Sequence, residues 1–479
     1  MHDRRRLLQA ILLVALLATA IAASAIPARS TYGAQVSVDE PQYLMTALSL
    51  GNDLNLDIDD EIAGGEYLDF HEVPLNTQTI NLRPDGQRIS PHDPLLPAIL
   101  ALPMRLGGWQ AARATLSVLA GLLAGATLWL AVVRLGVAVR TATWVVGALS
   151  AAPPLVSYGS QVYPEVPAAL AMVLAVGAVL GSPSRRSLLL FTLATTALCW
   201  LSVKYVPTTL VLVLLGLRRL VRTNHRAAAL GVATALTALG IVYLTVHQRV
   251  YGGWTVYAAG DHFVASEFQV IGTNPDLWGR SRRLLGLLVD RSFGLAPWTP
   301  AWLTLSGFLA AFVRRRPDGW DLLALPFAAG WATATWVALT MHGWWWPGRQ
   351  LVVVLPLAIV LIAHGVDRAR ATLAPVVAGS LVGTGAWLWL AVEASTRRRT
   401  IVVDFEETAW PIYRLLRHTF PDVRGSTGAM LWAGAWGVLV VALAVWGWRS
   451  VGRDQDARGS EGADADVPPL DLNSGGAIR

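Results

Sequence analysis

The chain has 479 residues, of which 54% are hydrophobic and only 15% charged, and its mean hydropathy is +0.47. This composition excludes an ordinary soluble domain and is typical of a multi-span membrane protein. The net charge of +6 does not indicate a nucleic-acid partner, because the arginines form short clusters between apolar runs. The single cysteine, Cys199, excludes an internal disulfide framework.

The N-terminus is basic and is followed by the apolar residues 7–26. Small residues at Ala22, Ala23 and Ala25 resemble the cleavage region of a signal peptide. We expect an uncleaved first membrane helix instead, because many further apolar runs follow.

Apolar runs recur along the chain and predict an all-α polytopic bundle of about twelve transmembrane helices. The expected helices span residues 7–26, 110–133, 141–158, 165–181, 188–203, 206–219, 227–247, 296–313, 320–340, 349–364, 373–392 and 429–448.

The charges between these helices orient the bundle. Arginine clusters fall on alternate connections, starting with Arg4–Arg6, whereas the turns 159–164 and 341–348 contain no arginine or lysine. Basic connections face the cytoplasm. The pattern therefore predicts a plasma-membrane protein with both termini cytoplasmic, although Arg397–Arg399 in the outer loop 393–428 depart from it.

Two outer segments are long, at about 27–109 and 248–295. Within the first, residues 94–109 are apolar but interrupted by prolines, which predicts a helix lying in the membrane interface. The whole of 1–448 then forms one transmembrane domain. The tail 449–479 is rich in Gly, Asp and Pro, and we expect it to be disordered and cytoplasmic.

The first outer segment also contains the acidic run DLNLDIDDE at 53–61. An EF-hand is excluded because the run lacks the glycine at position six and the glutamate at position twelve. A looser cation site stays open.

Unusual polar residues gather at one end of the predicted helices, the outer end, while the helix centres contain almost no ionisable groups. A proton-coupled transporter usually needs such groups at mid-membrane. The pattern therefore favours a site at the outer surface, and its candidate residues are Asp39, Glu40, His92, Asp93, Glu165, Lys204, His342 and Arg349.

Each candidate acid has two interpretations. Asp39 can cap a helix with Glu40 in its first turn, or it can serve as the general base for an acceptor hydroxyl. Glu165, between two prolines, is either solvated or lines the same pocket. His92 and Asp93 form either a turn or part of the substrate site.

The cations also have two interpretations. Lys204 is the chain's single lysine and either extends to the interface or neutralises a lipid phosphate. Arg349 follows Pro347-Gly348, and its guanidinium suits a phosphate through paired hydrogen bonds. The tryptophans 344–346 before it are expected of an aromatic belt.

Several of these segments, taken in order, resemble the GT-C class of membrane glycosyltransferases, which includes protein O-mannosyltransferases and lipid A aminoarabinose transferases. The resemblance covers about residues 1–370. The segments that carry it are Asp39-Glu40-Pro41-Gln42-Tyr43, SPHDPLLPAILALP (90–103), Tyr163-Pro164-Glu165, DRSFGLAPWTPAWL (290–303) and GWWWPGRQLVVVLPL (343–357). The sequence departs from the family pattern at Asp93, where proline is frequent, and at Gln350, where tyrosine is common.

The resemblance implies a polyprenyl-phosphate-linked sugar as donor and a glycan, lipid or protein acceptor at the extracytoplasmic face. It implies that transfer inverts the anomeric carbon. It identifies no certain cofactor and leaves a divalent metal open. The roles that we expect are catalysis by Asp39, Glu40 and Glu165, donor-phosphate binding by Lys204, Arg349 and His92, and a substrate pocket with Tyr43, Asp93, His342 and Trp346.

Two alternatives stay open. A transporter of lipid-linked sugar or polysaccharide would show ionisable groups or broken helices at mid-membrane. A non-catalytic member would bind lipid-linked sugar without turnover. The retained Asp39-Glu40 pair argues against this alternative.

Overall fold

The computed structural model describes residues 2–79, 85–256, 276–425 and 427–463. Helices dominate these ranges. The only β-structure within them consists of isolated bridges, such as Asp57 with Ile89, and none extends into a strand. The protein is therefore all-α in the part described, as predicted.

Each of the twelve predicted helices has a counterpart, often with different ends. The counterparts are α1 His2–Ala23, α4 Leu95–Trp129, α5 Val139–Ser150, α7 Glu165–Leu180, α8 Arg185–Leu201, α9 Val206–Arg222, α10 Arg226–Tyr251, α14 Leu305–Arg315, α15 Asp321–Ala332, α16 Leu355–Arg368, α17 Leu373–Ser395 and α19 Thr427–Ala463.

Shorter helices occupy the connections. They are α2 Glu40–Asn52, α3 Asp59–Gly64, α6 Leu155–Tyr158, α11 Leu277–Ser281, α12 Arg283–Val289, α13 Leu295–Trp298 and α18 Pro411–Leu416, with 3₁₀ turns η1 Glu66–Asp69, η3 Val203–Tyr205, η5 Pro300–Thr304, η7 Arg349–Leu351, η8 Arg370–Thr372 and η9 Phe405–Glu407. Two π-helical segments, η2 Leu130–Arg134 and η6 Thr333–Val337, extend α4 and α15.

Five of the described helical segments are long and apolar enough to cross a membrane. They are Arg4–Ala23, Leu95–Arg134, Arg226–Tyr251, Arg370–Ser395 and Gly428–Val451. The chain is thus a helical membrane protein. The total of about twelve spans stays a prediction, because the other helices are shorter than a full span.

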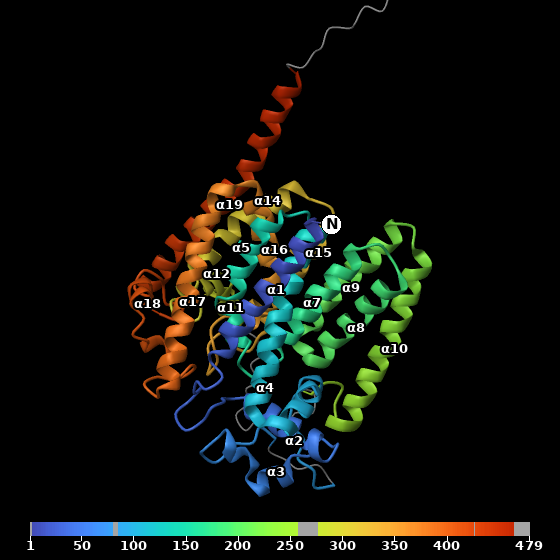
Figure 1. Ribbon diagram of the computed structural model, residues 1–479, viewed down its shortest axis with the longest axis vertical. Helices are drawn as coiled ribbons and strands as arrows, with labels where there is room; N and C mark the ends of the chain where they lie inside the picture. The colour runs from blue at the N-terminus through green and yellow to red at the C-terminus, as the bar shows by residue number, and fades with distance from the viewer. Residues whose placement is uncertain (1, 80–84, 257–275, 426, 464–479) are drawn as a thin grey trace, which may run out of the picture.

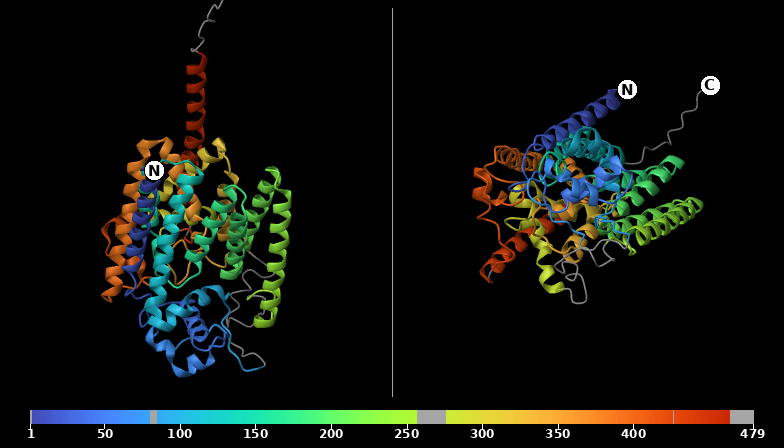
Figure 2. Two further views of the ribbon diagram at one scale, coloured as in Figure 1. Left: turned by 45° about the vertical axis from the view of Figure 1, so that its right-hand side comes forward. Right: turned by 90° about the horizontal axis from the view of Figure 1, so that it is seen from below.

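Burial distinguishes inner from outer helices. Residues 351–364, which include most of α16, are all buried, and α7 is nearly so. In contrast, α1 and α10 expose leucines and isoleucines such as Leu16 and Ile241, as expected of faces that contact lipid. Figures 1 and 2 show α10 and α19 at the edges of the bundle. The two buried helices α7 and α16 contact each other in its interior.

The predicted interfacial helix at 94–109 is the first part of α4. The helix path breaks at Gly107 and Gly108, and Gly108 has φ +62°, which a residue with a side chain rarely adopts. Residues 95–106 therefore form a separate helical arm that packs against α2. Because of this break, residues 95–106 pack against α2, and the rest of α4 packs against the helices of the bundle.

The loop layer with α2 and α3 lies at one end of the bundle, and α1 begins and α19 ends toward the opposite end (Figure 1). The second outer segment, predicted at 248–295, contains α11 and α12, and its residues 257–275 lie outside the described ranges. The tail differs from the prediction of disorder from residue 449, because α19 continues to Ala463. Residues 464–479 lie outside the described ranges.

Candidate functional site

Arg349 is the centre of a buried cluster of charges in the interior of the bundle. Its Nη2 lies 2.7 Å from Oδ2 of Asp39, and its Nε lies 2.9 Å from Oε1 of Glu165. Nζ of Lys204 donates to the same Glu165 oxygen at 2.6 Å. Four charged residues that we selected from the sequence therefore form one connected ion-pair network, with two cations and two carboxylates.

The backbone brings these side chains together from four places in the fold. Asp39 immediately precedes α2, Glu165 is the first residue of α7, Lys204 lies in η3 between α8 and α9, and Arg349 opens η7 before α16. A carboxylate in the first turn of a helix is favoured by the helix dipole, which suits Glu165.

Gly348 fixes the backbone conformation from which the Arg349 side chain reaches the cluster. Its φ is +82°, and a Cβ added there would lie 2.8 Å from Leu295 and 3.0 Å from Pro154. Only glycine fits such a conformation in so crowded a place. The guanidinium also lies over Tyr163, with Cζ 3.9 Å from the ring centroid, and this cation–π contact helps to hold it beside the two carboxylates.

Asp39 occupies the N-cap position of α2, but its side chain makes no capping hydrogen bond. The capping interpretation is therefore wrong. Its second oxygen accepts a hydrogen bond from Nε2 of Gln78 at 2.9 Å. Burial alone would raise the pKa of Asp39, but the Arg349 guanidinium, His92 and the Gln78 amide together lower it to about 2.

His92 reaches the cluster through Gln78. Its Nε2 lies 2.6 Å from Oε1 of Gln78, and its ring stacks on Tyr43 with centroids 4.4 Å apart. His92 is thus linked to Asp39 through the Gln78 amide, and Tyr43 stacks on the His92 ring. A phosphate role for His92 stays a prediction.

Glu40 is fully buried and makes its own set of contacts. It accepts hydrogen bonds from the backbone N–H of Val162 at 2.8 Å and from Ser37, and Arg113 lies 3.9 Å away. Burial raises the pKa of Glu40, and Arg113 and these hydrogen bonds oppose that rise. These contacts connect the start of α2, next to Asp39, with the turn before α7, next to Glu165. Glu40 therefore helps to fix the positions of Asp39 and Glu165 relative to each other.

Asp93 is buried in a second network. Its carboxylate accepts hydrogen bonds from the backbone N–H of Val203 and the Tyr243 hydroxyl, both at 3.0 Å, and lies 2.9 Å from His247. Val203 precedes Lys204, so Asp93 anchors the turn that presents the lysine. The structure places Asp93 beside the ion-pair cluster and in contact with α10.

Two further predicted residues lie in other surroundings. His342 packs against Phe293, with Nε2 3.6 Å from Asp290. Trp346 is completely buried among Trp298, Trp387 and Phe405 and forms part of the core. The structure does not bring these two side chains into the ion-pair cluster through the contacts of the described residues.

Three residues of the site were not selected from the sequence: Gln78, Tyr163 and Arg113. Arg113 carried a signal, because an arginine inside an apolar run is unusual. Its guanidinium donates to the backbone oxygens of Ile26 and Ala28 at 2.7 and 3.1 Å and supports Glu40. Gln78 lies in a polar loop with no periodicity, so no pattern distinguishes it.

Buried charges are costly, and this cluster offsets the cost by pairing. Oε2 of Glu165 is an exception, because it is buried and has no hydrogen-bond partner among the described residues. Two cations, two carboxylates and one unsatisfied carboxylate oxygen give the site the means to hold an anion, to accept a proton and to accept a hydrogen bond from a hydroxyl group.

Comparison with known proteins gives little overall similarity. No protein-family model and no curated protein sequence matches the chain. Among solved structures, the crystal structure of ArnT from Cupriavidus metallidurans bound to undecaprenyl phosphate aligns with a TM-score of 0.47 and 15% identity, over 96% of this chain and 81% of that chain. We therefore base the functional proposal on the residues of the site and the sequence motifs.

Proposed function

We propose that this chain is a membrane glycosyltransferase of the GT-C class that transfers a sugar from a polyprenyl-phosphate-linked donor to an acceptor at the extracytoplasmic face. The observation that carries the proposal is the convergence of Arg349 and Lys204 on Glu165, with Asp39 attached to the same guanidinium. Residues of this kind at one end of a membrane bundle are functional by default.

Arg349 and Lys204 supply the phosphate site. Arginine offers a planar, bidentate face and lysine a compact point charge, and both are common partners of phosphate. Without donor, these cations are neutralised by Asp39 and Glu165. A donor phosphate at Arg349 therefore competes with Asp39, and we expect it to take over one of the guanidinium hydrogen bonds.

This competition explains how Asp39 becomes a base. A carboxylate with a pKa of about 2 accepts protons poorly at neutral pH. Once the phosphate replaces Asp39 at Arg349, Asp39 loses the positive charge that lowers its pKa most, and the pKa of Asp39 rises. Donor binding thereby activates the base, and acceptor is not deprotonated before donor is present.

The transfer step is then a single displacement. The acceptor oxygen forms a bond to the anomeric carbon while the bond from that carbon to the phosphate oxygen breaks. Asp39 takes the acceptor proton, and Arg349 and Lys204 stabilise the charge of the departing polyprenyl phosphate. The unpaired oxygen of Glu165 is placed to accept a hydrogen bond from a sugar hydroxyl. One displacement inverts the anomeric carbon.

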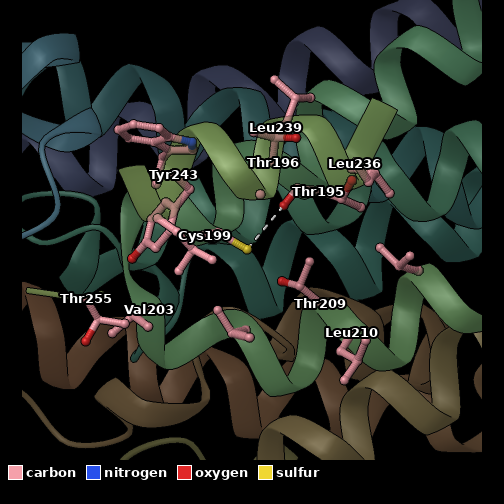
Figure 3. Close-up of a pocket in the computed structure, with 15 residues that line it drawn as sticks. Thr195, Thr196, Cys199, Val203, Thr209, Leu210, Leu236, Leu239, Tyr243 and Thr255 are labelled. Atoms are coloured by element: carbon pink, nitrogen blue, oxygen red, sulfur yellow. Dashed lines mark hydrogen bonds between the residues drawn. The ribbon is translucent and has the colours of Figure 1, made fainter. Parts of the chain in front are cut away.

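A groove beside Lys204 suits the isoprenoid chain. It has a volume of about 460 Å³ and lies between α8, α9 and α10, as Figure 3 shows. Its lining is mostly apolar and includes Val203, Val206, Leu236 and Tyr243. Pockets of this size and character are typical of small-ligand sites. Since Val203 precedes Lys204 in η3 and Val206 directly follows η3, a phosphate at Lys204 would direct its attached chain into the groove.

The proposal is tested by following the donor. Membranes containing the protein are incubated with radiolabelled polyprenyl-phosphate sugars and cell-envelope acceptors, and release of free polyprenyl phosphate is measured. We expect release with wild type and loss with Arg349→Ala at equal protein levels. Movement of intact donor across the membrane without release would identify a transporter, and binding without release a non-catalytic member.

A further inference from the structure

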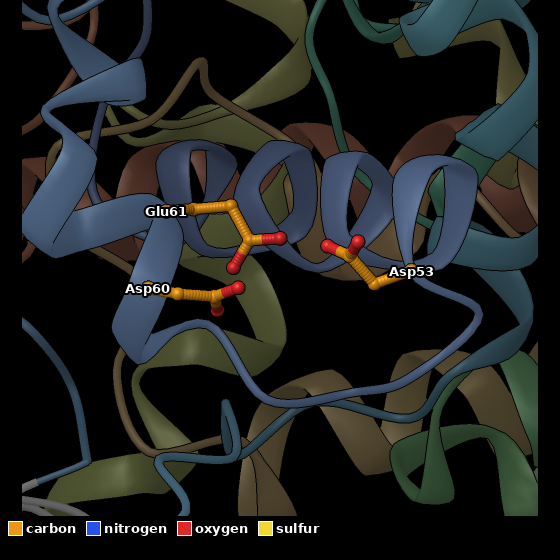
Figure 4. Close-up of side chains that lie close together, drawn as sticks. All are labelled: Asp53, Asp60 and Glu61. Atoms are coloured by element: carbon orange, nitrogen blue, oxygen red, sulfur yellow. The ribbon is translucent and has the colours of Figure 1, made fainter.

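A second cluster of carboxylates lies in the loop layer, apart from the Arg349 site. Asp53 directly follows α2 as its C-cap residue, and Asp60 and Glu61 belong to the first turn of α3. One carboxylate oxygen of each lies within 4.8 Å of the others. Figure 4 shows the three side chains pointing toward one another across the gap between the two helices.

Glu61 is the unusual member of this cluster. It is only 1% exposed, and neither of its carboxylate oxygens has a hydrogen-bond partner among the described residues. Burying a carboxylate without a partner is costly, and two neighbouring acids increase that cost.

Arg88, a basic residue that contacts this acidic run, is already engaged. Nε of Arg88 lies 2.8 Å from Oδ1 of Asp59, and its guanidinium also donates to the backbone oxygen of Thr79 at 3.0 Å. Asp57, the other acid of this run, accepts hydrogen bonds from the backbone N–H groups of Asp59 and Arg88. These two acids are thus satisfied within the loop, whereas Glu61 is not.

We propose that Asp53, Asp60 and Glu61 bind a calcium ion. Oxygen ligands about 2.4 Å from one ion lie at most about 4.8 Å apart, which is the limit that the three carboxylates meet. An all-oxygen ligand set selects a hard cation and disfavours zinc, which prefers nitrogen and sulfur. Calcium accepts irregular coordination completed by water, and magnesium demands a near-ideal octahedron.

The position of the site indicates what the ion does. The C-terminal end of a helix such as α2 carries partial negative charge, which a cation also stabilises. The ion would join the end of α2 to the start of α3. Asp39 and Glu40 lie at the other end of α2, about 20 Å away along the helix. The ion is therefore structural and supports the helix that presents them, and it does not depend on the proposed function.

The test uses the full chain purified in detergent. Calcium binding is measured by isothermal titration, and thermal unfolding is compared in EGTA, in 5 mM Ca²⁺ and in 5 mM Mg²⁺. Extracytoplasmic calcium modules bind with Kd values of about 10⁻⁴–10⁻³ M. We therefore expect calcium to raise the unfolding temperature by about 2–5 °C, and magnesium to raise it less.

Variants assign that shift to the cluster. Asp53→Asn with Asp60→Asn changes two exposed side chains and should weaken calcium binding at least about tenfold. Glu61→Gln should also remove the shift, because it removes the buried carboxylate that would pair with the ion. Glu66→Gln, an exposed acid in η1 outside the cluster, is the matched control and should keep the shift.

The proposal is overturned if wild type shows no calcium-dependent shift, or if the Asp53→Asn and Asp60→Asn variant keeps it. A shift that Glu66→Gln abolishes equally would mean a general surface-charge effect, which also overturns it. Because the readouts are binding and stability, a failure here leaves the glycosyltransferase proposal unaffected. Loss of sugar transfer with normal calcium binding would contradict only the glycosyltransferase proposal.

Discussion

At the scale of single residues, the Arg349–Asp39 ion pair controls how Asp39 can act. Asp39→Asn removes both the proton acceptor and the negative partner of Arg349. We expect sugar transfer to fall by about 10²–10⁴-fold, the usual cost of losing a general base. The measurement is the rate of polyprenyl phosphate release at matched protein levels. Near-normal turnover would show that the base is another residue, such as Glu40 or Glu165.

The same ion pair makes a prediction about pH. The pKa of Asp39 is lowered to about 2, so its stabilising contribution is full above about pH 4 and is lost as the pH falls toward 2. The difference in unfolding temperature between wild type and Asp39→Asn should therefore be constant from pH 8 to pH 5 and shrink only below about pH 4. A difference that declines near pH 6 or 7 would mean that Asp39 is not held by Arg349.

Arg349→Lys tests geometry separately from charge. Lysine keeps the positive charge but cannot bond two carboxylates in one plane or stack flat on Tyr163. We expect the donor-binding free energy to weaken by about 1–3 kcal/mol, which is roughly fivefold to more than a hundredfold in affinity. Arg140→Lys, in the N-terminal turn of α5, is the control and should bind donor normally. Unchanged affinity in Arg349→Lys would remove the bidentate role.

Sequence reasoning could identify the charged residues of the site but not their partners. Asp39, Glu165, Lys204 and Arg349 attract notice because charges beside apolar runs are costly and rare. Their pairing depends on contacts across 310 and 184 residues of chain, which no local pattern records. For the same reason Gln78 was missed and Asp39 was open to interpretation as a helix cap.

At the scale of elements, the turn before η7 aims Arg349, and Gly348 is its critical residue. Gly348→Ala adds a Cβ that would lie 2.8 Å from Leu295, in a backbone conformation that disfavours side chains by about 1–2 kcal/mol. We expect the turn to shift and donor binding to weaken about tenfold or more, because small misplacements at a site are costly. Binding of a polyprenyl phosphate to purified protein measures this.

Gly136→Ala is the matched control for that experiment. Gly136 also has positive φ, +67°, but a Cβ there meets no atom within 4 Å. This variant carries the backbone cost without the clash and lies away from the site, between η2 and α5. Equal loss of donor binding in both variants would mean that the effect is general destabilisation and not misdirection of Arg349.

Helix positions were predictable, whereas several helix ends were not. Apolar runs of the right length placed all twelve predicted helices, because burial in lipid or core demands long apolar stretches. The run at 94–109 and the helix after it form one segment, bent at Gly107–Gly108. Likewise, the apolar pattern ended near residue 448, but α19 continues through polar sequence to Ala463, where hydropathy gives no signal.

At the scale of the whole molecule, the ion-pair cluster and the groove between α8, α9 and α10 form adjacent parts of one proposed donor site. Asp93 joins them, since it anchors Val203 and accepts a hydrogen bond from Tyr243, and both of these residues line the groove. A donor that spans both parts gains affinity from its phosphate at one end and from burial of its chain at the other. The two contributions can be separated experimentally through chain length.

Filling the groove should therefore affect long donors selectively. Leu236→Trp projects a larger side chain into the space that Figure 3 shows. Displacing about 60 Å² of chain from apolar contact costs about 1.5 kcal/mol, so affinity for a long-chain polyprenyl phosphate should fall about tenfold. A short-chain analogue of two or three isoprene units should bind as it does to wild type. Leu214→Trp, on the exposed face of α9 and outside the groove lining, is the control. If Leu236→Trp weakened both chain lengths equally, the groove would not hold the chain, and if it weakened neither, the chain would lie along another face of the bundle.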